Sequence, residues 1–180
     1  MLDSTSHKRP SLSTRLAQAP IFVLALVAVA LIAPEPAGAG DVDDAYVFPL
    51  PAKHQYGDGF GAGRGHDGQD VFANCGRKLV AAHDGTVQKS KYDNSGYGNI
   101  LVLDVAGSGV DLLYAHMQDK PVVRKGDKVT AGQKVGVVGA TGNATGCHLH
   151  FEMHTAPGYQ EGGHAMQKVT KYLKAWDKYS

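Results

Sequence analysis

The segment GCHLHFEMH, residues 146–154, places histidine and glutamate at every second position. If the segment forms a β-strand, side chains two positions apart point to the same side. One side then carries His148, His150, Glu152 and His154. The other side carries the apolar residues Leu149, Phe151 and Met153. This pattern predicts a half-buried strand, and its polar side is a candidate metal site because imidazole and carboxylate groups are ordinary zinc ligands.

Three further candidate residues lie upstream of that strand. The segment HDGQD places His66 and Asp70 four residues apart, and the segment YAHM contains His116. Strand alternation puts His116 on the same face as Leu112 and Tyr114. A lone histidine in an apolar strand is more often a core residue than a ligand. The combination of all these features in one chain is what predicts a functional site.

Such a set of residues suits a catalytic zinc site. Three protein ligands with an open fourth position are typical of a catalytic site, and the open position holds a water whose pKa falls to about 7. Histidines that do not bind the metal can transfer protons near neutral pH. His148 and His150 have Cα atoms ~7 Å apart on a strand, so both can point into one site, and spacing alone leaves open which residues bind.

Glu152, the next residue on the same strand face, has three possible roles. It could replace Asp70 as the carboxylate ligand, accept a hydrogen bond from His150 behind the metal, or be solvated. We expect one of the last two roles.

The elements that position these residues are predicted to be mostly β-strands. Strand patterns occur at residues 78–92, 98–105, 110–117, 128–143 and 148–155. Asp84-Gly85 and the AGSG segment at 106–109 are hairpin signals. The chain is therefore expected to be mainly β, with an antiparallel sheet from about residue 70 to 155, whereas residues 41–65 look irregular.

The C-terminal segment has a helical pattern instead. Its apolar residues recur at helical spacing: Met166, Val169, Tyr172 or Leu173, and Trp176. This stripe predicts a short helix packed on the sheet.

Composition fits one domain of ordinary size. The chain has 180 residues, of which 43% are hydrophobic and 19% charged, enough to form a core. The formal net charge of +1 gives no reason to expect a nucleic-acid partner.

The N-terminus has the layout of a secretory signal peptide. Lys8, Arg9 and Arg15 precede an uncharged apolar run at residues 19–33, and Ala37-Gly38-Ala39 resembles a cleavage site. The alternative is a membrane anchor, but fifteen apolar residues are fewer than the ~20 that a spanning helix needs. We therefore predict a signal peptide over 1–39, an extracytoplasmic location and no stable membrane span after cleavage.

Export changes the interpretation of the two cysteines, Cys75 and Cys147. A disulfide is expected in an oxidising compartment, and thiolate metal ligation is the alternative. We favour the disulfide.

The ordered series of motifs resembles the lysostaphin-like (LytM-type) zinc metallopeptidases, which hydrolyse bacterial cell-wall peptides. The resemblance runs from about Phe60 to Thr155 through HDGQD, AAHDGTV, GYGNILVLD, LLYAHM, VRKGDKVTAGQKVGVVGATGNATG and HLHFE. It implies a twisted antiparallel sheet lining a groove, with zinc on the groove floor. Carried over residue by residue, it implies that zinc is bound by His66, Asp70 and His150, and that His116 and His148 are the catalytic pair.

This chain departs from the family pattern at three places. GAGRGH at residues 61–66 is glycine-rich where relatives often carry proline before the ligand histidine. GRKL stands at residues 76–79 where many relatives have GTPV, and Cys147 stands where many have proline. Exported relatives with cysteine at that position usually carry a second one near Cys75, which supports the disulfide. None of these departures removes a ligand.

The resemblance implies a secreted zinc metalloendopeptidase that hydrolyses peptide cross-links of bacterial peptidoglycan. Its partners would be the peptide stems and cross-links, and we expect a monomer. A non-catalytic wall-binding or hydrolase-regulating module of the same fold is the alternative, which the presence of all five site residues disfavours. The segment VRKGDKVTAGQKVGVVG also resembles the hairpin halves of lipoyl and biotinyl carrier domains. Such carriers need a lysine at the hairpin tip that follows, and the ATGNATG segment at that place has none, so this alternative is disfavoured.

The expected organisation has four parts. They are a signal peptide at 1–39, an irregular segment at 40–65, a catalytic domain at 66–157 and a helical tail at 158–180.

Overall fold

The computed structural model describes residues 46–63, 65–159 and 162–179. These residues belong to Gly38–Ser180, the second of the two units into which the chain divides. The predicted signal peptide and its cleavage site lie outside the described residues. Among the residues that the structure describes, no helix is long and apolar enough to cross a membrane.

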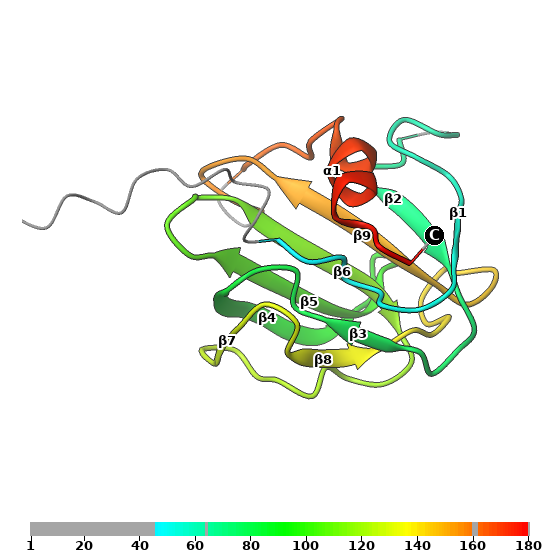
Figure 1. The fold of residues 1–180 in the computed structure, drawn as a ribbon, viewed down its shortest axis with the longest axis horizontal. Coiled ribbons are helices and arrows are strands. Elements are labelled where there is room, and N and C mark those ends of the chain that lie inside the picture. The colour runs from blue at the N-terminus through cyan, green and yellow to red at the C-terminus, as the bar shows by residue number, and fades with distance from the viewer. Residues whose placement is uncertain (1–45, 64, 160–161, 180) are drawn as a thin grey trace, which may run out of the picture. The chain divides into compact units, whose positions relative to one another are not determined.

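The described residues form two antiparallel sheets and one short helix (Figure 1). The larger sheet has the order β1-β2-β9-β6-β5-β4-β7, and β3 pairs with β8 in the smaller one. The strands of the larger sheet are β1 (Gln55–Tyr56), β2 (Gln69–Phe72), β4 (Gly85–Asp93), β5 (Gly98–Val105), β6 (Asp111–Met117), β7 (Lys128–Val129) and β9 (His148–His154). The smaller sheet contains β3 (Lys78–Val80) and β8 (Lys134–Val137), and the helix is α1 (Val169–Trp176). The mainly β class with a short C-terminal helix is confirmed.

The hairpin of β5 and β6 forms the centre of the larger sheet. These strands were predicted to within one residue, and the AGSG segment connects them as expected. Side chains of both strands are buried on both faces. One face joins the main core through Leu101, Leu103, Leu112 and Tyr114, while the other forms a smaller cluster of Ile100, Val102, Leu113 and Ala115.

Strand β9 is more buried than its sequence pattern predicted. All seven of its residues are buried, so the expected half-buried strand is wrong. The reason is its place between β2 and β6 inside the larger sheet, where its polar side chains contact one another and neighbouring strands.

The predicted hairpin around Asp84-Gly85 is also wrong. Strands β3 and β4 flank this dipeptide but do not pair, because β3 pairs with β8, and β4 pairs with β5 and β7. The connection between them is held by the core, since the Ala82 N–H donates to the Tyr114 hydroxyl at 2.7 Å. The chain therefore passes from one sheet to the other at this point.

The segment before His66 contains a strand that sequence analysis missed. Residues Gln55–Tyr56 form β1, in which Gln55 pairs with Phe72 and Tyr56 with Val71 of β2. This pairing places the segment beside the strand that carries Asp70.

Helix α1 packs as its apolar stripe predicted. Val169, Leu173 and Trp176 are buried, so Leu173 rather than Tyr172 is the core residue of the predicted pair. Directly after the helix, the Asp177 carboxylate accepts hydrogen bonds from His54 at 2.9 Å and from the Tyr56 hydroxyl at 3.1 Å. The C-terminal segment is thus connected to the β1 region.

Candidate metal centre and active-site groove

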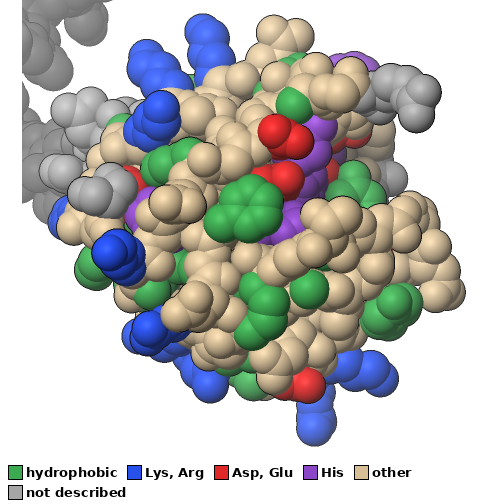
Figure 2. All heavy atoms as spheres, turned by 90° about the vertical axis from the view of Figure 1, so that its right-hand side faces the viewer, with side chains coloured by type: hydrophobic (Ala, Val, Ile, Leu, Met, Phe, Trp, Pro, Cys, Tyr) green, Lys and Arg blue, Asp and Glu red, His purple; other side chains and the backbone are tan. Residues whose placement is uncertain are grey.

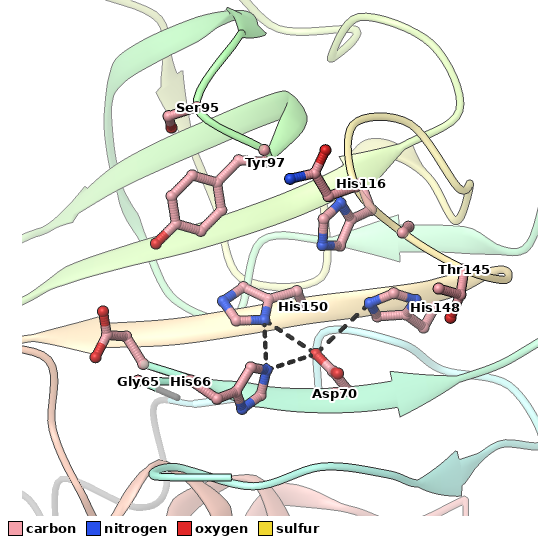
Figure 3. A pocket seen from close by; sticks show the side chains of 13 residues that line it. Gly65, His66, Asp70, Ser95, Tyr97, His116, Thr145, His148 and His150 are labelled. Atoms are coloured by element: carbon pink, nitrogen blue, oxygen red, sulfur yellow. Dashed lines mark hydrogen bonds and ion pairs between the residues drawn. The ribbon is translucent and has the colours of Figure 1, made fainter. Parts of the chain in front are cut away.

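Three candidate ligands converge at the junction of β2 and β9 (Figure 3). Asp70 of β2 is the register partner of His150 of β9, so their side chains share one face of the sheet. His66 reaches the same point from the loop before β2. His66 Nε2 lies 3.0 Å from His150 Nδ1 and 3.1 Å from Asp70 Oδ1, and His150 Nδ1 lies 2.9 Å from Asp70 Oδ1.

In His66 and His150, one ring nitrogen is hydrogen-bonded outside the cluster, and this bond determines which nitrogen faces the other ligands. His66 Nδ1–H donates to the Gly59 carbonyl at 2.9 Å, which leaves Nε2 for the metal. His150 Nε2–H donates to Glu152 Oε1 at 2.8 Å, which leaves Nδ1 for the metal. Metal-binding histidines usually have such a partner behind the ring. Two imidazoles and one carboxylate, all with free donor atoms in one cluster, fit zinc.

Glu152 supports His150 and is not a ligand. Its side chain is fully buried and also accepts hydrogen bonds from the Tyr97 hydroxyl at 2.8 Å and from His154 Nε2 at 2.5 Å. Burial acts to raise the pKa of Glu152, but these donors outweigh it and lower the pKa to about 2. Of the roles left open by the sequence, the hydrogen-bond partner of His150 is the one observed.

The charges in the centre are strongly coupled. Burial acts to lower the pKa of His150, but its hydrogen bonds to Asp70 and Glu152 outweigh burial and raise the pKa to about 9. Burial acts to raise the pKa of Asp70, yet the hydrogen bond from His150 and the nearby His148 and His66 lower it.

His116 faces this centre because the strand that carries it is irregular. Strict alternation predicted that His116 would share the face of Leu112 and Tyr114, which is the core face. That prediction is wrong, since the register between β5 and β6 shifts just before His116 and its φ is +59°. A bulge of this kind turns a side chain to the other face of a sheet. His116 consequently lies over the site, with ring centroids 4.7 Å from His148 and 5.8 Å from His150.

His116 and His148 have the same arrangement of ring nitrogens. His116 Nδ1–H donates to the Thr141 carbonyl and His148 Nδ1–H to the Gly146 carbonyl, both at 2.8 Å. The Nε2 atom of each ring is the one not used in these bonds, and that of His148 lies 3.6 Å from Asp70 Oδ1. Burial lowers the pKa of His116 to about 4, with the neighbouring imidazoles adding to this effect, so the ring is neutral at pH 7.

All five predicted site residues line one groove with a cavity of about 380 Å³. The lining residues are Gly65, His66, Asp67, Asp70, Ser95, Gly96, Tyr97, His116, Asn143, Ala144, Thr145, His148 and His150. Figure 2 shows histidine and acidic side chains gathered in a hollow of this face. We call this feature the groove.

Some residues of the site were not singled out from the sequence. Tyr97 lies in the matching segment GYGNILVLD, but nothing in the sequence indicated that its hydroxyl reaches Glu152. Gly59 and Thr141 contribute only backbone carbonyls, which no side-chain pattern can reveal.

The two cysteines are joined, as the sequence predicted. Cys75 and Cys147 form a disulfide, with Cα atoms 5.3 Å apart and a sequence separation of 72 residues. Thiolate ligation of the metal is therefore wrong for this pair. The bond anchors the chain one residue before His148.

Comparison with curated proteins finds bacterial cell-wall peptidases. The chain is 38% identical over 89 residues to peptidoglycan DD-endopeptidase ShyC of Vibrio cholerae, which covers 49% of this chain and 20% of that protein. It is 39% identical over 93 residues to glycyl-glycine endopeptidase ALE-1 of Staphylococcus capitis, which covers 52% of this chain and 25% of that protein. The chain thus matches only a fifth to a quarter of these relatives' length.

Comparison with solved structures finds peptidases with a similar fold. The catalytic domain of the antimicrobial peptidase lysostaphin from Staphylococcus simulans aligns with a TM-score of 0.60 and 31% identity, covering 67% of this chain and 92% of that domain. A zinc-containing peptidase from Vibrio cholerae aligns with a TM-score of 0.53 and 33% identity, covering 61% of this chain and 36% of that protein. That neighbour is named as a zinc-containing peptidase, and in this chain His66, Asp70 and His150 could hold a metal ion, which agrees with the zinc cofactor predicted from the sequence.

A family model decides the assignment. It matches residues 64–166, which include every residue of the metal cluster and more than half of the 180-residue chain. The predicted resemblance to lysostaphin-like peptidases is therefore confirmed, and the chain belongs to peptidase family M23.

Proposed function

We propose that this chain is a secreted zinc metalloendopeptidase that hydrolyses peptide cross-links of bacterial peptidoglycan. The observation that carries the proposal is the groove, in which the ligand atoms of His66, Asp70 and His150 lie within 4.8 Å of one another and two further imidazoles stand beside them. A non-catalytic module needs neither the donor cluster nor that second pair. The signal peptide at 1–39 and a catalytic domain at 66–157 remain part of this proposal.

The substrate class is proposed from the relatives. ShyC is named as a peptidoglycan DD-endopeptidase and ALE-1 as a glycyl-glycine endopeptidase. Both names describe cleavage within peptides, and an open groove on a sheet suits an extended peptide. The two names differ in the bond, so the proposal is restricted to peptide cross-links as a class.

A zinc ion bound in the groove would act as a Lewis acid, polarising the scissile carbonyl and lowering the pKa of a bound water. His66, Asp70 and His150 would hold the ion in the groove, and Glu152 keeps the His150 ring in the required orientation. His116 and His148 each use Nδ1 to bond a backbone carbonyl and keep Nε2 for other partners in the groove, so they can accept and return protons during hydrolysis. Protonated in turn, they can donate to the oxygen that becomes negative.

One wall of the groove is formed where two segments approach closely at glycine residues. The Asn143 N–H donates to the Gly96 carbonyl at 2.8 Å. Gly98 and Gly142 have φ of +67° and +73°, and a Cβ on Gly98 would lie 2.4 Å from Thr141 Oγ1. This contact between the loops after β4 and β8 keeps the Thr141 carbonyl in place behind His116.

The test is clearance of a suspension of purified peptidoglycan by the purified chain. We expect the turbidity to fall, the fall to stop when a chelator is added, and activity to return when zinc is restored. Asp70→Ala should be inactive under every condition. Wall binding without clearance by the zinc-loaded chain would contradict the proposal and favour a binding module.

A further inference from the structure

We propose that Gln69 is a positioning residue for the zinc ligand His66, and that Thr170 of helix α1 holds Gln69 in place. The two residues are 101 positions apart in the sequence, and neither lines the groove. The inference rests on the proposed zinc centre and concerns how its least protected ligand is held.

His66 is the least protected of the three ligands. Its side chain is 19% exposed, compared with 14% for Asp70 and 7% for His150. Asp70 and His150 lie on paired strands, whereas His66 ends a loop in which Gly61, Gly63 and Gly65 all have positive φ. Because glycine has large conformational freedom, such a loop has little stiffness of its own.

The two ends of the loop are nevertheless joined by hydrogen bonds. At its start, the Gly59 carbonyl accepts hydrogen bonds from His66 Nδ1 at 2.9 Å and from the Ala62 N–H at 3.1 Å. The Gly61 N–H donates to the His66 carbonyl at 2.7 Å. The position of Gly59 therefore sets the orientation of the His66 ring.

Gln69 adds side-chain hydrogen bonds to the backbone that leads to Gly59, where the Gly57 N–H also donates to the Asp70 carbonyl at 2.9 Å and the Asp70 N–H to the Asp58 carbonyl at 2.8 Å. It pairs with Phe151 of β9 and so faces the core side of the sheet, away from Asp70. Its side-chain amide donates to the carbonyls of Gly57 and Asp58, each at 3.1 Å, and to that of Asp70 at 2.8 Å. One buried amide thus links the start of the ligand loop to the strand that carries the second ligand.

Thr170 completes the arrangement from α1. Its hydroxyl donates to Gln69 Oε1 at 2.6 Å. A Cβ added to Gly59 would lie 3.2 Å from Gln69 Oε1 and 3.5 Å from Thr170 Oγ1, so the loop packs directly against this pair. With Oε1 held by the hydroxyl, the amide group has one orientation in which its N–H groups face the loop.

The experiment measures zinc affinity of the full chain by chelator competition, independently of hydrolysis. Gln69→Met keeps the length of the side chain and removes its polar atoms, and we expect about a tenfold or greater rise in the zinc Kd. Thr170→Val removes only the hydroxyl and should give a smaller rise, whereas Thr170→Ser should restore the parent affinity. The absorption spectrum of the cobalt(II)-substituted protein should change in the first two variants and not in the third.

Leu173→Ala is the matched control for a purely structural effect. It removes a buried contact of the same helix without touching Gln69 or Thr170, so it should lower the melting temperature and leave the zinc Kd of the folded protein unchanged. Parent affinity in Gln69→Met and Thr170→Val, or an equal loss in Leu173→Ala, would overturn the inference. If the parent binds zinc but leaves peptidoglycan intact, the proposed function fails while this inference stands.

Discussion

At the scale of single residues, the groove contains one group of residues for metal binding and another for proton transfer. His66, Asp70 and His150 direct their donor atoms at one point. His116 and His148 are held through Nδ1 by backbone carbonyls and keep Nε2 for the substrate side. Substitutions in the two groups should therefore have different consequences.

Removing either proton-transfer imidazole should leave the metal in place. In His116→Ala and His148→Ala we expect bound zinc near the parent level but a rate reduced by about 10²–10⁴-fold, the usual contribution of general acid–base catalysis. Zinc content by mass spectrometry and the clearance rate should be measured on the same samples. His164→Ala, at an exposed histidine outside the groove, is the control and should match the parent. Full activity in both groove variants would exclude the assigned roles.

Glu152→Gln tests the support behind His150. A neutral amide cannot accept the hydrogen bonds from His150, His154 and Tyr97 as the buried carboxylate does. We expect zinc affinity to fall by about 10–100-fold, as for other partners of metal-bound histidines. Tyr97→Phe removes one donor of the three and should have a smaller effect in the same chelator titration. Unchanged affinity in Glu152→Gln would mean that the His150 ring is held by packing alone.

At the scale of elements, local patterns predicted the strands better than their partners. Alternation and turn signals located β5 and β6 within one residue. The Asp84-Gly85 signal failed because a turn dipeptide does not specify pairing, and here the two flanking strands join different sheets. His116 was placed on the wrong face because alternation assumes a regular strand, whereas the shifted register reverses it.

Gly139→Ala tests how the segment after β8 positions β9. The Gly139 carbonyl accepts the His148 N–H at 3.1 Å, and a Cβ on Gly139 would lie 2.2 Å from the Gln118 backbone nitrogen. Because a backbone cannot move aside easily, we expect a loss of about 1–3 kcal/mol in the free energy of unfolding, measured in urea. Catalytic rate should fall as well, since His148 must move. Gly146→Ala, where a Cβ meets open space, should change stability by less than about 0.5 kcal/mol; equal stability of the two variants would refute the packing argument.

At the scale of the whole molecule, contacts between distant segments complete the site. The donor set, the disulfide and the family were accessible from the sequence because they depend on residue types in a fixed order. The contacts of Gln69 with Thr170 and of His54 with Asp177 were not, because residues 101 and 123 positions apart are brought together only by the tertiary structure. Nor could the sequence show that β9 is buried on both faces, since this follows from its place in the sheet.

The disulfide should contribute substantially to this assembly. The bond between Cys75 and Cys147 closes a loop with a separation of 72 residues, for which the chain-entropy model gives about 4 kcal/mol. The variant with both cysteines changed to serine should lose free energy of unfolding on that order, measured in urea. Reductant should destabilise the parent and leave this variant unaffected. Equal stability of parent and variant would show that the bond adds nothing to the folded state.

The central claim is that the groove cuts peptide bonds of peptidoglycan with zinc. The most direct measurement is mass spectrometry of the fragments that the zinc-loaded chain releases from purified peptidoglycan. The account predicts new amino and carboxyl termini within the cross-linking peptides, absent with a chelator and with His150→Ala. Fragments that carry new sugar ends with intact peptides, or the same peptide fragments from His150→Ala, would contradict it.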